Sequence, residues 1–235
     1  MFILYKRNEK QKRWLIKNPK EDFHMQYGVI PKSKLKKGSF SLHGHDFVVI
    51  PASVVDMKLK RKAQIITQKD IGYIIGYCCL GKESVVLESG AGSGGATVAL
   101  ARVCKKVYSV EIEKENIAIV KENLQKLSIK NVTLKEGDIY EKAPIKTADV
   151  FLLDVPEPWR AYKTMKSVKV GGHIVAYTPS ITQAAEFVNN LPKEFLHEKT
   201  VELMDRNWKI KGKAVRPVNA AIGHTAFLTF VRRLC

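Results

Sequence analysis

From Ser84 to the end of the chain, short apolar runs alternate with segments in which apolar residues recur every three or four positions. Runs of the first kind are typical of buried strands, and segments of the second kind are typical of helices with one apolar face. The predicted strands are Val85–Leu87, Val107–Val110, Val132–Leu134, Val150–Leu153 and His173–Thr178, the last entered through a Gly171-Gly172 turn. The predicted helices are Ala96–Val103, Lys114–Leu127, Arg160–Val168 and Ile181–Leu191. This alternation predicts an α/β fold with a mainly parallel sheet covered on both faces, which a last pair of strands closes at Val201–Met204 and Ala226–Val231.

The pattern differs over residues 1–56, where short apolar segments alternate with turn residues and no helix period occurs. The predicted strands there are Phe2–Lys6, Arg13–Ile16, Phe40–Leu42 and Asp46–Ile50. We therefore expect a small β-rich domain over residues 1–56. A linker and a first helix, Lys69–Cys79, fill residues 57–83, and residues 84–235 form the larger α/β domain.

Glycines follow the first strand of the larger domain and precede a predicted helix. Gly90, Gly92 and Gly94 alternate with other residues, and Gly95 comes directly after them. Glycine allows a positive φ and removes the side chain, so a ligand can lie against the backbone. The helix that follows offers free N–H groups and a partial positive charge at its first turn. The alternative is a glycine turn in an ordinary α/β domain.

Four acidic residues lie at or beside the ends of four successive predicted strands: Glu88, Glu111, Asp138 and Asp154. Ligands of open α/β sheets bind along the edge where the parallel strands end. Glu111 ends the second strand, where a carboxylate can accept both hydroxyls of a ribose. The order of strand, glycine turn, helix and acid predicts a site for a nucleoside cofactor, and it resembles the cofactor site of S-adenosylmethionine-dependent methyltransferases.

The segment Asp154-Val155-Pro156-Glu157-Pro158-Trp159 follows the fourth strand. Two prolines stiffen this turn and Trp159 supplies a flat ring. Because the segment follows a strand end, it is where a target group would meet the cofactor. The alternative is a rigid loop in which Trp159 only covers the core.

The chain has a formal net charge of +17, and this charge is unevenly distributed. Residues 1–69 hold 16 Lys and Arg against 5 Asp and Glu, a net charge of +11, which leaves +6 for the other residues. A basic region beside a nucleotide-type site indicates a polyanionic partner, in first place a nucleic acid. The alternative is a lysine-rich surface that only keeps the protein in solution.

Other features narrow the class of protein. No apolar run reaches the length of a membrane span, and the first residues have the wrong charge order for a signal peptide. The four cysteines form no Cys-x-x-Cys pair, so neither a zinc site nor a disulfide framework is predicted, and we expect no metal. This cysteine usage favours a reducing compartment, the cytoplasm.

Separated motifs along nearly the whole chain resemble one family, the transfer RNA (adenine-N1)-methyltransferases that modify the T-loop. These motifs are Gln64-Ile65-Ile66 with Lys69-Asp70, Leu87–Gly95, Leu153–Trp159, Ala176–Pro179 with Gln183, and Gly223–Leu228 with Arg232-Arg233. The resemblance implies a Rossmann-like catalytic domain behind a small N-terminal β domain, usually in a tetramer. It implies S-adenosylmethionine as cofactor, tRNA as substrate and N1 of the adenine at position 58 as target, with position 57 left open as a second target.

The resemblance also implies roles for individual residues. Asp154 would be the catalytic carboxylate, facing both cofactor and target base. The expected cofactor-binding residues are Ile66, Glu88, Gly90, Gly92, Ser93, Gly94, Gly95, Glu111, Asn116, Asp138, Ile139 and Asp154. The expected substrate residues are Tyr177, which would stack on a flipped adenine, with Trp159 and His224.

The sequence departs from the family at Thr67-Gln68, where relatives often have Tyr-Pro. Tyr73 and Trp159 are candidates to replace that tyrosine. Two other functions stay open: methylation of another RNA or of a protein, and a non-catalytic RNA-binding subunit. Retention of the glycine turn, Glu111 and Asp154 argues against the second.

Overall fold

A computed structural model describes the chain except for residues 8–11, 54–58 and 220–222. The gaps leave part of the predicted small domain, and residues 57 and 58 of the predicted linker, outside the described residues. The chain divides into two compact units, Met1–Leu59 and Lys60–Cys235.

The described residues of the first unit form strands and one short 3-10 turn, η1 (Lys32–Lys34). Its four-stranded antiparallel sheet has the order β2-β1-β6-β5. The strands are β1 (Phe2–Lys6), β2 (Arg13–Ile16), β5 (Gly38–Leu42) and β6 (His45–Pro51), and a separate hairpin pairs β3 (Phe23–Met25) with β4 (Gly28–Ile30). The core consists of Leu4, Ile16, Ile30, Leu35, Phe47 and Val49. Sequence analysis predicted the four strands of the sheet but missed the three-residue strands β3 and β4.

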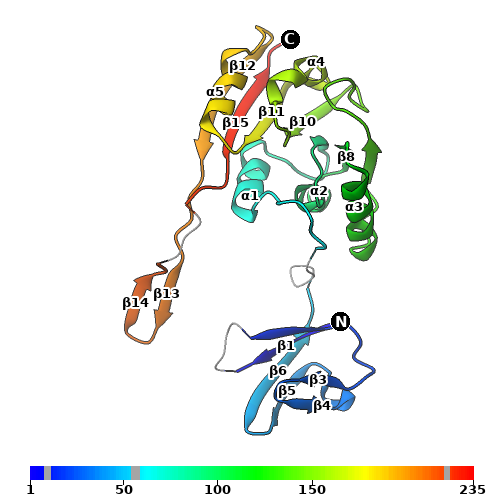
Figure 1. Cartoon of the computed structure of the whole chain (residues 1–235), viewed down its shortest axis with the longest axis vertical. Helices are drawn as coiled ribbons and strands as arrows, with labels where there is room; N and C mark the ends of the chain where they lie inside the picture. Colours follow the sequence, from blue (N-terminus) through cyan, green and yellow to red (C-terminus); the bar gives the residue numbers. More distant parts are fainter. Residues whose placement is uncertain (8–11, 54–58, 220–222) are drawn as a thin grey trace. The chain divides into compact units, whose positions relative to one another are not determined.

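The second unit is built on a seven-stranded sheet with the order β12-β15-β11-β10-β7-β8-β9 (Figure 1). The central strands are β7 (Val85–Ser89), β8 (Lys106–Glu111), β9 (Val132–Glu136), β10 (Ala148–Leu153) and β11 (Val168–Thr178), and they run parallel. The pair β12 (Phe195–Glu202) and β15 (Phe227–Arg233) extends the sheet, with β15 antiparallel to both of its neighbours. This is the mainly parallel α/β sheet that the alternating pattern predicted, and it has the Rossmann-like fold that the family resemblance implied.

Helices cover both faces of this sheet. They are α1 (Gln68–Tyr77), α2 (Gly95–Ala101), α3 (Lys114–Lys126), α4 (Tyr162–Met165) and α5 (Ile181–Asn189), with a 3-10 turn η3 (Pro158–Ala161) before α4. Neighbouring strand residues point to opposite faces, so Val86 belongs to the core cluster that includes Ile74 of α1, while Leu87 belongs to the cluster that includes Phe187 of α5. No described helix has both the length and the apolar character needed to cross a membrane.

Three predictions within the second unit were wrong. The strand predicted at Val201–Met204 is β12, which begins at Phe195 and ends at Glu202. The predicted helix Arg160–Val168 is a 3-10 turn and one helical turn that end at Met165, because Val168 already pairs with Ala148 as a strand residue. The Gly171-Gly172 pair lies inside β11 rather than before it. A Cβ at Gly172 would lie 2.6 Å from the carbonyl oxygen of Asp149, so the glycine allows close strand contact here.

One hairpin of the second unit was not predicted. It lies between β12 and β15 and consists of β13 (Trp208–Lys211) and β14 (Ala214–Pro217), which pair with each other and with no other strand of the described chain (Figure 1).

Candidate active site

A pocket of about 360 Å³ lies in the second unit where the parallel strands end. Residues that follow β7, β8, β9 and β10 line it, together with Ala63 and Gln64 from the segment before α1. Predicted site residues found in its wall are Gly90, Gly92, Glu111, Asn116, Asp138, Ile139 and Asp154. The strand-end geometry thus brings most of the predicted cofactor residues around one cavity.

The glycine turn forms the floor of this pocket. Gly90 has φ +81°, and a Cβ there would lie 1.8 Å from the carbonyl oxygen of Asp154, so no other residue fits without moving the backbone. Gly92 has φ +53° and also lines the pocket. Gly94, at φ +80°, is the N-cap of α2. A ligand therefore meets bare backbone beside the start of a helix.

Glu111 is held rigidly at the end of β8. One carboxylate oxygen accepts the backbone N–H of Gly92 at 2.7 Å, and the other accepts those of Ile112 and Glu113 at 2.9 Å each. A carboxylate oxygen has two lone pairs, so the oxygen bonded to Gly92 can accept a further donor. Because Glu111 also lines the pocket, it has the position and the spare capacity to accept ribose hydroxyls.

Asp154 differs from Glu111 because its carboxylate has no hydrogen-bond donor among the described residues. Its backbone N–H donates to the carbonyl of Ser89 at 2.9 Å, and Asp154 is one of the residues that line the pocket. Burial raises the pKa of Asp154 to about 7, and the nearby carboxylates of Glu88 and Glu111 add to the rise. An acid with a strongly raised pKa in a cavity is a mark of a functional site.

Glu88 lies beneath the pocket rather than in its wall. The side chain is buried and accepts the hydroxyl of Thr97 at 2.7 Å, which ties β7 to α2. Burial raises the pKa of Glu88 to about 7. Glu88 is therefore a predicted cofactor residue that does not line the pocket. Its negative charge acts on the pocket by raising the pKa of Asp154.

Ile66, Ser93, Gly94 and Gly95 do not line the pocket either. The hydroxyl of Ser93 accepts the backbone N–H groups of Lys62 and Ala63 at 3.0 Å each. A Cβ at Gly95 would lie 2.7 Å from the Cβ of Ile65, and Ile66 is buried in the core. Together these residues hold segment 60–66 against the glycine turn and so place Ala63 and Gln64 in the pocket wall, which the sequence did not predict.

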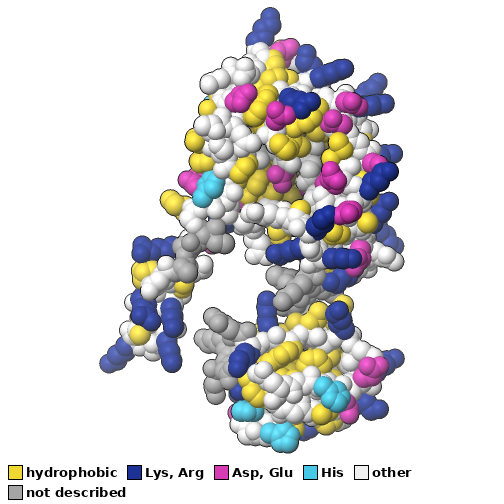
Figure 2. All heavy atoms as spheres, viewed as in Figure 1, with side chains coloured by type: hydrophobic (Ala, Val, Ile, Leu, Met, Phe, Trp, Pro, Cys, Tyr) yellow, Lys and Arg dark blue, Asp and Glu magenta, His cyan; other side chains and the backbone are white. Residues whose placement is uncertain are grey.

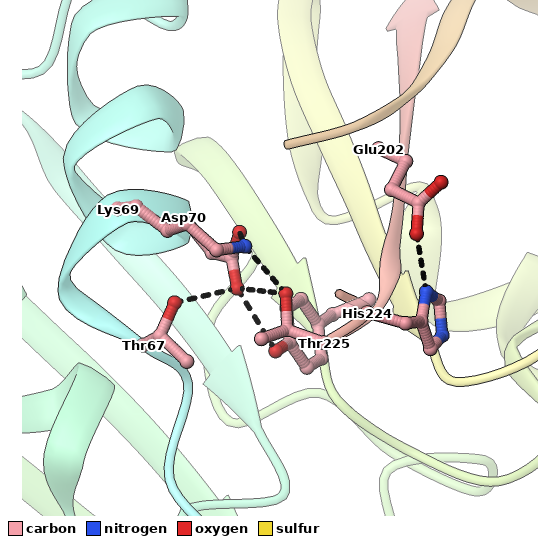
Figure 3. A network of polar contacts seen from close by, with 7 residues as sticks. Thr67, Lys69, Asp70, Glu202, His224 and Thr225 are labelled. Carbon is pink, nitrogen blue, oxygen red and sulfur yellow. Dashed lines mark hydrogen bonds and ion pairs between the residues drawn. The ribbon is translucent and has the colours of Figure 1, made fainter. Parts of the chain in front are cut away.

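A buried polar network lies around Asp70 (Figure 3). Its carboxylate accepts hydrogen bonds from Lys69 at 2.8 Å, Thr67 at 2.7 Å, Thr225 at 2.8 Å and Tyr177 at 3.2 Å. Burial alone would raise the pKa of Asp70, but the hydrogen bonds from Lys69, Thr67 and Thr225 outweigh it and lower the pKa. The network joins the first turn of α1 to the end of β11 and to the segment before β15.

The predicted substrate residues do not line the pocket, and all three have partners within the chain. Tyr177 is 9% exposed and its hydroxyl donates to Asp70. Trp159 is half-buried and packs on the core beneath α5. His224 is exposed, and its two ring nitrogens lie 2.6 Å from a carboxylate oxygen of Glu202 and 2.8 Å from the carbonyl oxygen of Pro179.

The structure also places the residues around the departure from the family motif. Thr67 bonds Asp70, and its carbonyl accepts the N–H of Ile71 in the first turn of α1. Tyr73 packs on Tyr77 and Phe230 in the core, and its hydroxyl accepts a hydrogen bond from Lys199. Tyr73 is thus committed to the core and does not line the pocket. The described residues contain no cluster of side chains suited to a metal ion.

The sequence matches a known family and several known proteins. Residues 47–216 match the family described as tRNA methyltransferase complex GCD14 subunit. The chain is 31% identical to the tRNA (adenine(57)-N(1)/adenine(58)-N(1))-methyltransferase TrmI of Methanocaldococcus jannaschii, over 96% of this chain and 93% of that protein. It is 32% identical to the tRNA (adenine(58)-N(1))-methyltransferase TrmI of Thermus thermophilus, over 92% of this chain and 91% of that protein.

Solved structures agree with this likeness. The tRNA (m1A58) methyltransferase TrmI from Aquifex aeolicus superimposes with a TM-score of 0.85 at 27% identity, covering 100% of this chain and 96% of that chain. A SAM-dependent O-methyltransferase from Thermotoga maritima gives a TM-score of 0.88 at 25% identity, covering 100% and 92%. By sequence over nearly its full length and by fold, the chain belongs to the GCD14/TrmI family of tRNA (adenine-N1)-methyltransferases.

Proposed function

We propose that this protein transfers a methyl group from S-adenosylmethionine to N1 of an adenine in the T-loop of tRNA. The target is the adenine at position 58, and the relative from Methanocaldococcus jannaschii, named for positions 57 and 58, makes position 57 a second candidate. The observation that carries the proposal is the pocket wall, where a glycine turn, a fixed acceptor in Glu111 and an unpartnered carboxylate in Asp154 meet.

The residues of the pocket fit S-adenosylmethionine. A side chain at Gly90 would collide with the backbone of Asp154, so the turn keeps its bare surface for a ligand. Glu111 would accept the ribose hydroxyls with Asn116 close by, and Asp138 and Ile139 would border the adenine ring of the cofactor. Ser93, Gly94, Gly95 and Ile66 would support the methionine end by fixing the turn. The cofactor, when bound, supplies an electrophilic methyl group on a positively charged sulfur.

Asp154 would be the catalytic residue. N1 of a neutral adenine carries a lone pair, so no base is needed to create the nucleophile. The bound cofactor would supply the methyl group and leave as the neutral thioether, and the adenine beside Asp154 would become positively charged as its N1 accepts the methyl group. A carboxylate beside the base stabilises this developing charge, and a group of this kind contributes roughly 3 kcal/mol.

The target base must leave its tertiary contacts before it reacts. N1 lies on the Watson–Crick edge, so the adenine has to be flipped into the enzyme. We propose that the basic first unit, which contains the predicted domain of residues 1–56, holds the tRNA phosphates. The affinity for tRNA should therefore fall steeply as the salt concentration rises. Tyr177 and Trp159 stand as candidates to pack against the base. Because their side chains are partly or wholly buried among core residues, this role requires a local rearrangement on binding.

Assembly and compartment complete the proposal. We propose a homotetramer in the cytoplasm, because the family resemblance implies a tetramer and the cysteines favour a reducing compartment. Light scattering on the purified chain tests the first point: a mass of four chains is expected, and a monomer contradicts it.

The function itself is tested by incubating an unmodified tRNA transcript with the protein and S-adenosylmethionine and mapping the modified nucleoside. We expect 1-methyladenosine in the T-loop, and a transcript with guanine at position 58 should lose that product. Methylation of another base, or of protein alone, would refute the proposal.

A further inference from the structure

The hairpin β13–β14 has two chemically different faces. Residues directly opposite in an antiparallel pair share a face, and the register pairs Trp208 with Pro217 and Ile210 with Val215. The alternate positions pair Lys209 with Arg216 and Lys211 with Ala214. One face is therefore apolar and the other carries three cations, Lys209, Lys211 and Arg216, which we call the cationic face.

The cationic face has no internal counter-charge. From Arg206 to Asn219 the chain contains five Lys and Arg and no Asp or Glu. All three cations of the face are exposed, and none forms an ion pair within the described part of the chain. Figure 2 shows the Lys and Arg side chains gathered over this hairpin. A cluster of Lys and Arg on one face without a nearby acid in the hairpin is the electrostatic pattern typical of surfaces that bind polyanions.

The hairpin leaves the sheet at the edge where the pocket lies. Glu202 ends β12 and pairs with Phe227 at the start of β15, which in turn pairs with Thr178 at the end of β11. Since β11 runs parallel to β10, this is the edge from which Asp154 follows β10. His224 fixes the base of the connection there through its contacts with Glu202 and the carbonyl of Pro179.

We propose that the cationic face of the β13–β14 hairpin binds the phosphate backbone of the tRNA whose adenine enters the pocket. The inference rests on the proposed function and adds to it a second phosphate-binding surface, outside the basic first unit. The partner follows from charge complementarity: phosphates supply the only abundant negative charge on the proposed substrate. His224 then has a positioning role at the base of this hairpin.

A pair of charge-matched variants tests the proposal. The hairpin variant replaces Lys209, Lys211 and Arg216 with glutamine. The control variant replaces Lys82, Lys130 and Lys146 with glutamine. These three lysines are exposed and form no ion pair within the described chain. They precede β7, β9 and β10, so they lie at the opposite edge of the sheet. Both variants lose three positive charges, so they differ only in where the charge is lost.

The readout is tRNA affinity as a function of salt, with light scattering and S-adenosylmethionine affinity measured on the same samples. We expect the hairpin variant to bind tRNA roughly 10- to 100-fold more weakly at low salt. The negative slope of log affinity against log salt concentration should become less steep by about 2. The control variant should change affinity by less than about threefold. Both should bind S-adenosylmethionine like the wild type, and Lys209→Arg with Lys211→Arg should keep tRNA affinity.

Three outcomes would overturn the proposal. Equal weakening in both variants would mean that only net charge matters. A changed molar mass in the hairpin variant alone would mean that this face joins copies of the chain instead. Product mapping with the wild type keeps the two proposals apart: if the wild type forms 1-methyladenosine while the hairpin variant binds normally, only this inference fails.

Discussion

Two enclosed carboxylates in the second unit, Asp70 and Asp154, have opposite surroundings. Asp70 is wholly buried and accepts hydrogen bonds from four side chains, one of them the cationic Lys69. Asp154 lines the pocket, has no donor among the described residues and lies near the acids Glu88 and Glu111. The pKa of Asp70 is accordingly lowered, and the pKa of Asp154 is raised to about 7.

The difference separates a structural carboxylate from one that awaits a ligand. The negative charge of Asp70 is stabilised by hydrogen bonds within the chain, so these hydrogen bonds contribute to the stability of the folded state. The charge of Asp154 is stabilised by nothing in the described chain, so it costs free energy until a cation arrives. A sulfonium donor and an adenine that becomes positive during methylation would each supply that cation.

The largest effect is expected for Asp154→Asn, which keeps the shape of the side chain and removes its charge. Turnover on unmodified tRNA at saturating S-adenosylmethionine should fall by roughly 100- to 1,000-fold, because about 3–4 kcal/mol of charge stabilisation is lost. Cofactor affinity should stay within a modest factor of the wild type. Single-turnover kinetics measure the loss, and Asp205→Asn, an exposed acid without an ion pair among the described residues, is the control. Near-normal turnover in Asp154→Asn would remove Asp154 from the mechanism.

Asp70→Ala should act on stability instead. It leaves Lys69, Thr67 and Thr225 without their common acceptor and should cost about 3 kcal/mol of unfolding free energy, the lower end for a broken buried pair, because Lys69 can turn toward water. Tyr177→Phe removes one long hydrogen bond from the same network and should cost about 1 kcal/mol. Urea unfolding followed by circular dichroism compares them. Equal costs for the two variants would show that Asp70 is not the centre of the network.

The pH dependence of stability should have opposite sign at the two sites. The raised pKa of Asp154 means that the folded state keeps a proton that the unfolded chain releases, so this group destabilises the fold increasingly as pH rises from about 4 to about 7. Asp154→Asn should therefore melt higher than the wild type, by a margin that grows between about pH 4 and about pH 7 and then levels off. The lowered pKa of Asp70 gives a contribution present at neutral pH and lost in acid, so the deficit of Asp70→Asn should shrink below about pH 4. Melting curves at several pH values test both, and parallel curves for Asp154→Asn and wild type would contradict the first.

The sequence predicted the Asp154 region far better than the Asp70 region, for a physical reason. The order of strands and helices places every strand end at one edge, so Glu111, Asp138 and Asp154 could be brought together without coordinates. Two of the four partners of Asp70, Tyr177 and Thr225, lie 107 and 155 residues away along the chain. No local sequence pattern indicates contacts between residues so far apart. The sequence therefore did not predict that the hydroxyl of Tyr177 donates a hydrogen bond to Asp70.

The β13–β14 hairpin, in contrast, is marked by a local sequence pattern. Trp208-Lys209-Ile210-Lys211 alternates apolar and basic residues and is followed by Gly212, which has a positive φ. That is a hairpin pattern, although neither face of the hairpin is buried. The predicted helix Arg160–Val168 was too long for another reason. Val168 fits the helical spacing of the apolar residues before it, but it is a buried residue of strand β11.

The titration of Asp154 in the presence and absence of cofactor tests the central claim most directly. With ¹³C-labelled aspartate, and the signal assigned through Asp154→Asn, the midpoint should lie near pH 7 in the free protein. Saturating S-adenosylmethionine should lower it by one unit or more, while S-adenosylhomocysteine, which lacks the sulfonium charge, should leave it nearly unchanged. A midpoint near pH 4 in the free protein, or the same response to both ligands, would contradict the account of Asp154 as a carboxylate that awaits a cation.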